Sequence, residues 1–313
     1  MTTTMHYDFR FAKPSLAMRL GERIVAMQDS EFKGADGLEQ TVANRKLPRD
    51  APMPDKYNDR FTVERWRAEG QDVITLHPAT GKGAWHIIYF HGGGYYLPMF
   101  KEHWPLVAAL VEATGASVSV PLYKIVPEHD YHPANNMADA VYERVKADWG
   151  DDRITLCGDS AGGNMALSLA IQRRDAGKSL PARLIPFAPW LDMAMKDEDA
   201  RAIEPDDVIL GIDAIRIVGK WWAGDRGTDH PHASPLYADL SGLPPIAIFQ
   251  GRHDIFTVDS RSFTAKAAAD GVPVALYEYA GAPHVYMAMT FTREAKDTFR
   301  LVKQFIDEGV PAQ

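Results

Sequence analysis

The residues best suited to chemistry lie at 158–162, which read Gly-Asp-Ser-Ala-Gly. An apolar, β-prone stretch precedes them at 154–157, and a helix-prone stretch follows at 164–170. A G-x-S-x-G turn between a strand and a helix holds its serine in a strained conformation with the hydroxyl exposed. The first amides of the helix also give a positive potential where an anion would form. Ser160 is therefore the predicted nucleophile, although a serine that only caps the helix fits the same turn.

A glycine-rich motif upstream of Ser160 fits its predicted role as a nucleophile. Residues 91–94 read His-Gly-Gly-Gly and follow the β-prone residues 84–90. Consecutive glycines after a strand let backbone N–H groups converge on one point, which suits the oxyanion of a tetrahedral intermediate. A phosphate-binding loop would need a lysine and a serine or threonine in Walker spacing, and Tyr95 and Tyr96 stand there instead. The motif predicts an oxyanion hole.

Two further residues complete the order Ser, Asp, His along the chain. Asp254 follows the buried-strand pattern of residues 245–250, and His284 follows that of residues 274–279. Parallel α/β sheets place their sites at the carboxyl ends of strands. We therefore expect His284 to take the proton of Ser160 and Asp254 to hold the imidazole and stabilise its charged form.

These motifs resemble the bacterial branch of the hormone-sensitive-lipase-like family of α/β-hydrolase esterases. The likeness covers roughly residues 60–308 and includes further matching runs at 121–129, 133–134, 139–140, 188–192, 234–236 and 239–245. It implies an ester hydrolase with the triad Ser160, Asp254 and His284. By the family pattern, the oxyanion donors are the amides of Gly93, Gly94 and Ala161. Departures at 124–125 and 256–259 leave the substrate range open.

The expected reaction is acyl transfer through an acyl-enzyme on the serine, followed by hydrolysis with an activated water. It needs no cofactor and no metal, and the histidines outside the triad lie in loops without metal-ligand spacing. Two alternatives stay open. An amide or formamide hydrolase would use the same triad, and a non-catalytic small-ligand receptor shares the fold, although such receptors similar to this family lack the histidine found here at 284.

The composition of the chain limits the binding partners and the cellular location that we expect. The chain has 313 residues, 46% of them hydrophobic, and a net charge of −8, which argues against binding nucleic acid. The single cysteine, Cys157, excludes an internal disulfide. No stretch approaches the 18 apolar residues of a membrane span, and the first residues lack a signal-peptide pattern. We expect a cytoplasmic enzyme with a small ester substrate, and family habit is compatible with a homodimer.

Hydrophobic patterning predicts an α/β-hydrolase fold with eight mostly parallel strands and helices on both faces. The expected strands are 61–66, 71–77, 85–91, 117–122, 153–157, 183–188, 245–250 and 274–279. The expected helices are 101–114, 134–148, 161–176, 257–270 and 293–308. Residues 61–313 form the predicted catalytic domain, and residues 1–60 form an N-terminal helical cap segment with a helix at 14–28.

Residues 190–235 interrupt the alternation of strands and helices, because they show no strand pattern and contain an apolar helix at 209–222. This insertion resembles the cap of the family, and with the N-terminal helix it would roof Ser160. An enclosed pocket of limited depth favours short- to medium-chain acyl esters. Aromatic side chains near the motifs or in the insertion are candidates for lining it, or else belong to the core: Tyr95, Tyr96, Trp221 and Tyr286.

Overall fold

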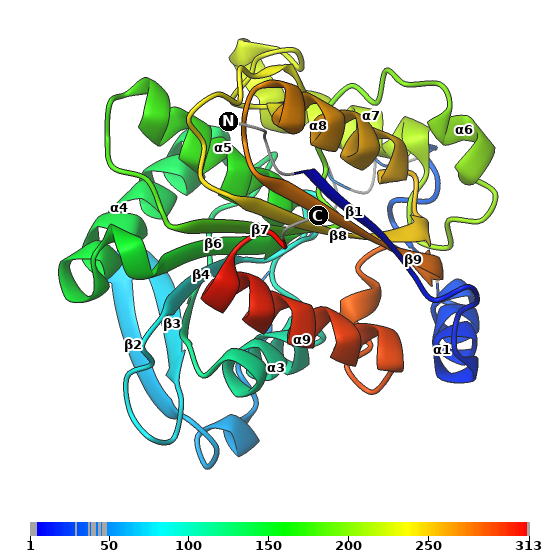
Figure 1. The fold of residues 1–313 in the computed structure, drawn as a ribbon. Helices are drawn as coiled ribbons and strands as arrows, with labels where there is room; N and C mark the ends of the chain where they lie inside the picture. Colours follow the sequence, from blue (N-terminus) through cyan, green and yellow to red (C-terminus); the bar gives the residue numbers. More distant parts are fainter. Residues whose placement is uncertain are drawn as a thin grey trace.

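A nine-stranded sheet forms the centre of the computed structural model, which describes residues 5–28, 30–36, 38, 42, 45 and 49–311. The strand order is β1-β9-β8-β7-β6-β4-β5-β3-β2 (Figure 1). Neighbours are parallel from β1 to β5, whereas β3 is antiparallel to both β5 and β2. The strands are β1 (Met5–Arg10), β2 (Thr62–Ala68), β3 (Gln71–His77), β4 (His86–Phe90), β5 (Ser117–Pro121), β6 (Ile154–Asp159), β7 (Arg183–Phe187), β8 (Ile246–His253) and β9 (Val274–Pro283).

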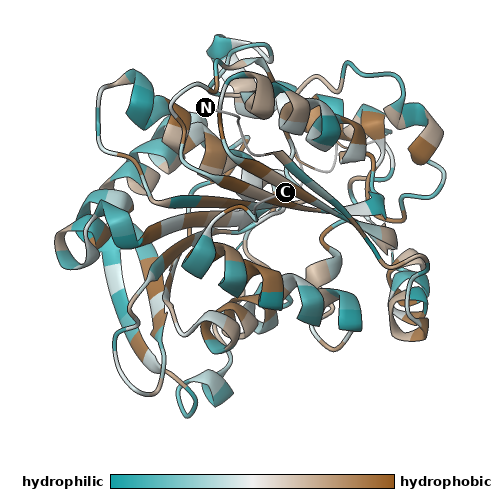
Figure 2. Cartoon of the chain, viewed as in Figure 1, coloured by the Kyte–Doolittle hydropathy of each residue, from teal (hydrophilic) through white to brown (hydrophobic). Residues whose placement is uncertain are grey.

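Helices cover both faces of the sheet because its central strands are apolar on both sides. On β4, Ile87 and Tyr89 pack into the core on the side of α3 and α9, whereas Ile88 and Phe90 pack on the side of α4, α5 and α8. Figure 2 shows the strands as the most hydrophobic part of the chain, with hydrophilic residues on the outer surfaces of the helices. These helices are α3 (His103–Thr114), α4 (Tyr131–Trp149), α5 (Ala161–Asp175), α8 (Thr257–Ala269) and α9 (Arg293–Glu308).

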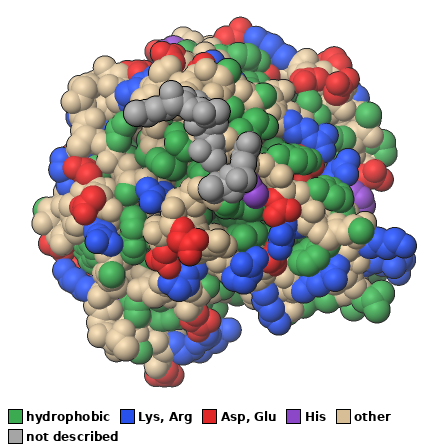
Figure 3. All heavy atoms as spheres, in the orientation of Figure 1, with side chains coloured by type: hydrophobic (Ala, Val, Ile, Leu, Met, Phe, Trp, Pro, Cys, Tyr) green, Lys and Arg blue, Asp and Glu red, His purple; other side chains and the backbone are tan. Residues whose placement is uncertain are grey.

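Short 3-10 helices connect several of these elements: η1 (Asp55–Tyr57), η2 (Asp151–Arg153), η3 (Gly224–Arg226), η4 (Pro235–Tyr237) and η5 (Tyr286–Ala288). None of the helices in the described part of the chain is long and apolar enough to cross a membrane. On the face drawn in Figure 3, Lys and Arg side chains are interspersed with Asp and Glu.

The N-terminal segment corrects one prediction. All eight predicted strands are present, but the prediction of eight is wrong by one because residues 5–10 form a ninth strand, β1. It lies at the edge of the sheet, parallel to β9, with Met5 opposite Val274. Residues 1–60 are therefore not a purely helical cap segment. The helix predicted at 14–28 is α1 (Leu16–Ala26), capped by the Ser15 hydroxyl, and residues 1–4, 29, 37, 39–41, 43–44 and 46–48 of this segment lie outside the described residues.

Residues 190–235 contain no strand, as predicted; all of them are described, and they form α6 (Ala200–Ile203) and α7 (Ile212–Ala223). Hydrogen bonds that involve Ser30, Phe32 and Lys33 join this insertion to the N-terminal segment. The Ser30 hydroxyl donates to the Ile209 carbonyl at 2.7 Å, and the Gly211 N–H donates to the Phe32 carbonyl at 2.7 Å. The two segments therefore meet over one edge of the sheet, although they are far apart in the sequence.

Candidate active site

Ser160 directly follows β6 and begins α5, so it stands on the predicted strand-to-helix turn. Its backbone has φ 55° and ψ −118°, a strained conformation for a residue with a side chain. β6 and α5 pass so close that a Cβ on Gly158 would overlap the backbone of Gly162, and a Cβ on Gly162 would overlap the carbonyl of Phe90 on β4. In the part of the chain described here, the Ser160 hydroxyl has no hydrogen-bond partner, which leaves it open to a base or a substrate.

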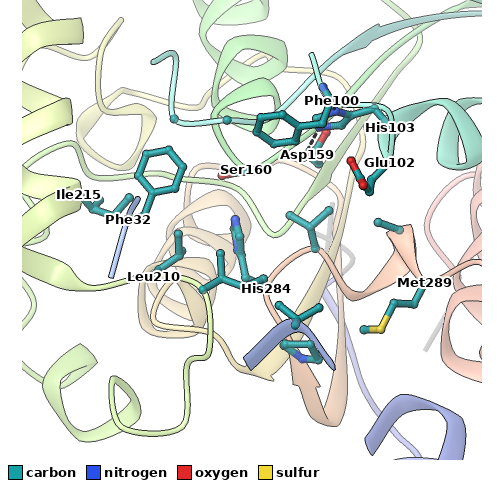
Figure 4. A pocket seen from close by; sticks show the side chains of 17 residues that line it. Phe32, Phe100, Glu102, His103, Asp159, Ser160, Leu210, Ile215, His284 and Met289 are labelled. Atoms are coloured by element: carbon teal, nitrogen blue, oxygen red, sulfur yellow. Dashed lines mark hydrogen bonds and ion pairs between the residues drawn. The ribbon is translucent and has the colours of Figure 1, made fainter. Parts of the chain in front are cut away.

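The structure brings Asp254 and His284 together. Each follows the end of its strand, and β8 and β9 are neighbours that pair as far as His253 and Pro283. The Asp254 Oδ2 atom lies 2.8 Å from His284 Nδ1. The imidazole therefore has its other nitrogen, Nε2, available, and Figure 4 shows the ring extending towards Ser160.

Buried partners fix the carboxylate of Asp254, which is fully buried. Its Oδ1 atom accepts the Phe256 N–H at 2.8 Å, and its Oδ2 atom also accepts the side-chain amide of Gln250 at 2.7 Å. Burial lowers the pKa of His284, but the charge of Asp254 and its hydrogen bond outweigh this, and the net pKa is raised above 6.5. The pair is built to stabilise an imidazolium ion.

The three amides predicted as oxyanion donors are unoccupied. Gly93 and Gly94 have φ values of 108° and 62°, which glycine adopts without strain, and both line the same cavity as Ser160. Ala161 is the first residue of α5. Within the described residues, the backbone N–H groups of Gly93, Gly94 and Ala161 donate to no other atom. Unpaired N–H groups beside a nucleophile are what an oxyanion hole requires.

Asp159, the residue before Ser160, anchors the glycine loop. The Gly92 N–H donates to its Oδ1 atom at 3.0 Å, and the Tyr89 hydroxyl donates to the same atom. A Cβ on Gly92 would overlap the Asp159 carboxylate. Burial acts to raise the pKa of Asp159, but His103, with Nε2 3.5 Å from its Oδ2 atom, lowers it overall. The carboxylate therefore holds the loop in its charged form.

An apolar cavity of about 260 Å³ lies over Ser160 and His284 (Figure 4). Its walls come from six parts of the chain: α1, the following N-terminal segment, the segment between β4 and α3, the turn between β6 and α5, the 190–235 insertion and the segment after β9. Among the described lining residues, Glu102, His103 and Asp159 add polar side chains to those of Ser160 and His284. The other lining side chains are Val25, Phe32, Phe100, Ile209, Leu210, Ile215, Pro283, Val285, Ala288 and Met289.

The four aromatic residues predicted to line the pocket do not line this cavity. Tyr95 stacks on Trp222 at a centroid distance of 3.5 Å and donates its hydroxyl to Asn164. Tyr96 and Trp221 contact each other, and the ring of Tyr96 meets the edge of Phe32.

The hydroxyl of the remaining one, Tyr286, lies 2.6 Å from that of Thr298, and its ring packs against Tyr279. Tyr95, Tyr96 and Tyr286 are buried in the core, and Trp221 is partly buried and packs against it, which is the alternative that their sequence positions left open.

No local sequence pattern marks the residues that line the cavity. Phe32, Leu210 and Met289 lie in segments far apart in the chain, and only the fold brings them to one wall. The described residues hold no group of three His, Cys, Asp or Glu side chains arranged to bind a metal ion.

Comparison with known proteins identifies the family. The model of an alpha/beta hydrolase fold family matches residues 87–288, which include every predicted site residue. The chain belongs to the α/β-hydrolase family.

Among the relatives of this α/β hydrolase is an acetyl-hydrolase of Streptomyces hygroscopicus, 33% identical over 225 residues, which are 69% of this chain and 75% of the relative. Carboxylesterase NlhH of Mycobacterium tuberculosis is 30% identical over 276 residues, 82% of this chain and 84% of the relative. A solved esterase from the bacterial hormone-sensitive lipase family has a TM-score of 0.80 and 25% identity, and the match covers 96% of this chain and 100% of that one. The predicted family and fold are confirmed.

Proposed function

We propose that this α/β hydrolase is a serine carboxylesterase that cleaves short- to medium-chain acyl esters through an acyl-enzyme. The observation that carries the proposal is the 2.8 Å contact between Asp254 and His284, with the imidazole extending towards a strained Ser160 in an apolar cavity. The names of the relatives, acetyl-hydrolase and carboxylesterase, agree with ester hydrolysis.

In the proposed reaction, Ser160 attacks the ester carbonyl while His284 Nε2 takes its proton. The amides of Gly93, Gly94 and Ala161 bind the oxyanion, and the imidazolium is stabilised by Asp254. The His284 imidazolium then protonates the leaving alkoxide. Neutral His284 finally activates the water that hydrolyses the acyl-enzyme and releases the acid.

Acyl-chain length tests the proposed function. The rate should rise at first, because each methylene buried in the cavity contributes about 0.8 kcal/mol. Once the chain reaches side chains such as Phe32 and Leu210, overpacking costs about 1–3 kcal/mol and the rate should fall. We expect kcat/KM for p-nitrophenyl esters from C2 to C16 to peak at about C4 to C8. A peak at C14 or longer contradicts the proposed substrate class. If none of the esters in the series is hydrolysed, the proposed esterase activity is wrong.

The pH dependence tests the role of His284. As the base it must be neutral, and since the pKa of His284 is raised above 6.5, kcat/KM should rise with pH through one ionisation above that value. The measurement is kcat/KM between pH 5 and 9, with product separated chromatographically so that the ionisation of p-nitrophenol does not interfere. An activity that stays flat from pH 5 to 8 excludes His284 as the base.

Three finer predictions belong to the same proposal. We propose that α1 with the residues after it and the 190–235 insertion act together as the cap, which the hydrogen bonds between Ser30, Phe32 and the insertion support. The cytoplasmic location and the homodimer stay predictions from the sequence. Size-exclusion chromatography with light scattering measures the oligomeric state directly.

A further inference from the structure

Asp207 is a buried carboxyl that the proposed reaction does not use. It lies in the 190–235 insertion, between α6 and α7, and is fully buried. Its Oδ1 atom accepts the N–H groups of Ile209 at 2.9 Å and Leu210 at 2.8 Å. Its Oδ2 atom accepts the N–H of Ile255 at 3.0 Å. One carboxylate thus satisfies three backbone donors from two separate parts of the chain.

These three donors belong to functional parts of the site. Ile209 and Leu210 line the cavity over Ser160, and Ile255 directly follows Asp254. The carboxylate of Asp207 is therefore a direct link between the roof of the cavity and the turn that carries the catalytic carboxylate.

We propose that Asp207 is a positioning residue that fixes the Asp254 turn to the cavity roof, and that its negative charge stabilises the protonated form of His284. This inference rests on the proposed function, because it assigns Asp207 a part in the same triad. Asp207 touches no substrate in this scheme and acts only through Asp254, His284 and the two roof residues.

The charges around Asp207 come from each element packed against it. Asp254 and His284 face it from the ends of β8 and β9, and Lys33 donates from the N-terminal segment to its backbone carbonyl. Asp206, the adjacent acidic residue, is exposed. His253, the last residue of β8, also interacts electrostatically with Asp207 and is itself paired with Glu22 of α1.

These surroundings determine the protonation state of the Asp207 carboxyl. Burial and then the charge of Asp254 raise its pKa to about 6. Because the pKa of His284 is raised above 6.5, Asp207 is mostly ionised when His284 loses its proton. Its charge is one of the causes that raise the pKa of His284, so removing that charge should lower it.

The decisive variant is Asp207→Asn. An asparagine keeps one oxygen acceptor for the roof amides, but it loses the charge and turns N–H groups towards the Ile255 N–H. We expect the acid limb of kcat/KM to move about half a pH unit or more to lower pH. We also expect kcat at the plateau to fall about tenfold with KM changed by less than about threefold, since the turn of Asp254 loosens. Asp207→Ala, which removes every acceptor, should in addition raise KM.

Asp206→Asn is the matched control, because it makes the same change of charge on the adjacent, exposed side chain. It should leave kcat, KM and the acid limb as in the wild-type enzyme. If the acid limb of Asp207→Asn coincides with that of the wild type, the proposal for Asp207 is overturned, whereas the proposed esterase function is not affected. If the wild type hydrolyses no ester, both fail, and Ser160→Ala sets the background that identifies this outcome.

A second measurement covers the case in which Asp207 variants do not fold. In the wild-type protein, the ¹⁵N and ¹H signals of the His284 ring can be followed by NMR between pH 4 and 9. We expect two inflections, one near pH 6 from the ionisation of Asp207 and one at higher pH from the ring itself. A single inflection overturns the proposal.

Discussion

Ser160→Ala is expected to lower kcat for p-nitrophenyl butyrate by about 10⁶, the loss found when the nucleophile of a Ser-His-Asp triad is removed. The substitution takes away one oxygen that has no hydrogen-bond partner in the described part of the chain. The fold should therefore be kept, with an unchanged circular dichroism spectrum and melting temperature. Alanine also removes nothing that supports the strained turn, because the glycines at 158 and 162 allow its close packing.

Ser168→Ala is the matched control for this experiment. Ser168 lies two turns further along α5, and its hydroxyl donates to the His232 carbonyl at 2.7 Å. Its loss should cost about 1 kcal/mol of unfolding free energy and leave hydrolysis intact. Turnover by Ser160→Ala at more than a few per cent of the wild-type rate would mean that another residue is the nucleophile.

Asp254→Asn is expected to lower kcat by about 10⁴, as the same change does in the serine-protease triad. The Asp254 Oδ1 atom accepts the Phe256 N–H, so an asparagine would keep its oxygen there and turn its NH₂ group towards His284 Nδ1. The imidazole would then accept at Nδ1 and carry its proton on Nε2. In that tautomer His284 cannot take the proton of Ser160.

The same NH₂ group would also face the donating amide of Gln250. We therefore expect Asp254→Asn to lower the melting temperature moderately, which differential scanning calorimetry measures alongside the steady-state kinetics. Asp206→Asn, an exposed carboxyl changed in the same way, controls for the loss of one charge. A fall in kcat of less than tenfold would contradict the orienting role of Asp254.

Local sequence patterns predict most of the sheet and the reacting groups, because both are encoded over short stretches. All eight apolar runs form strands, and Ser160, Asp254 and His284 each directly follow a strand end. Gly158 is required because a Cβ there would overlap the backbone of Gly162 in the same turn. The local pattern did not predict β1, because none of its residues is fully buried. This strand depends on pairing with β9, which is distant in the sequence.

The cavity wall could not be predicted for a similar reason. Its residues belong to six segments of the chain, and the pattern within one segment does not show which other segments it contacts. Tyr95 and Tyr286 stand close to the motifs in sequence, yet their hydroxyls bond to Asn164 and Thr298 in the core. Asp159 and Asp207 act through backbone N–H groups of other segments, so their roles become visible only in three dimensions.

The pairing of β1 with β9 has a consequence for the order of events during synthesis. Met5 leaves the ribosome early, whereas its partner Val274 emerges after most of the sheet. The segment that follows β1 carries Val25 and Phe32 to the cavity. The nascent chain must therefore keep its first strand unpaired while the central strands form, and this late, long-range closure is entropically slow. Enzymatic activity should appear on the ribosome only after the β9 strand has been released.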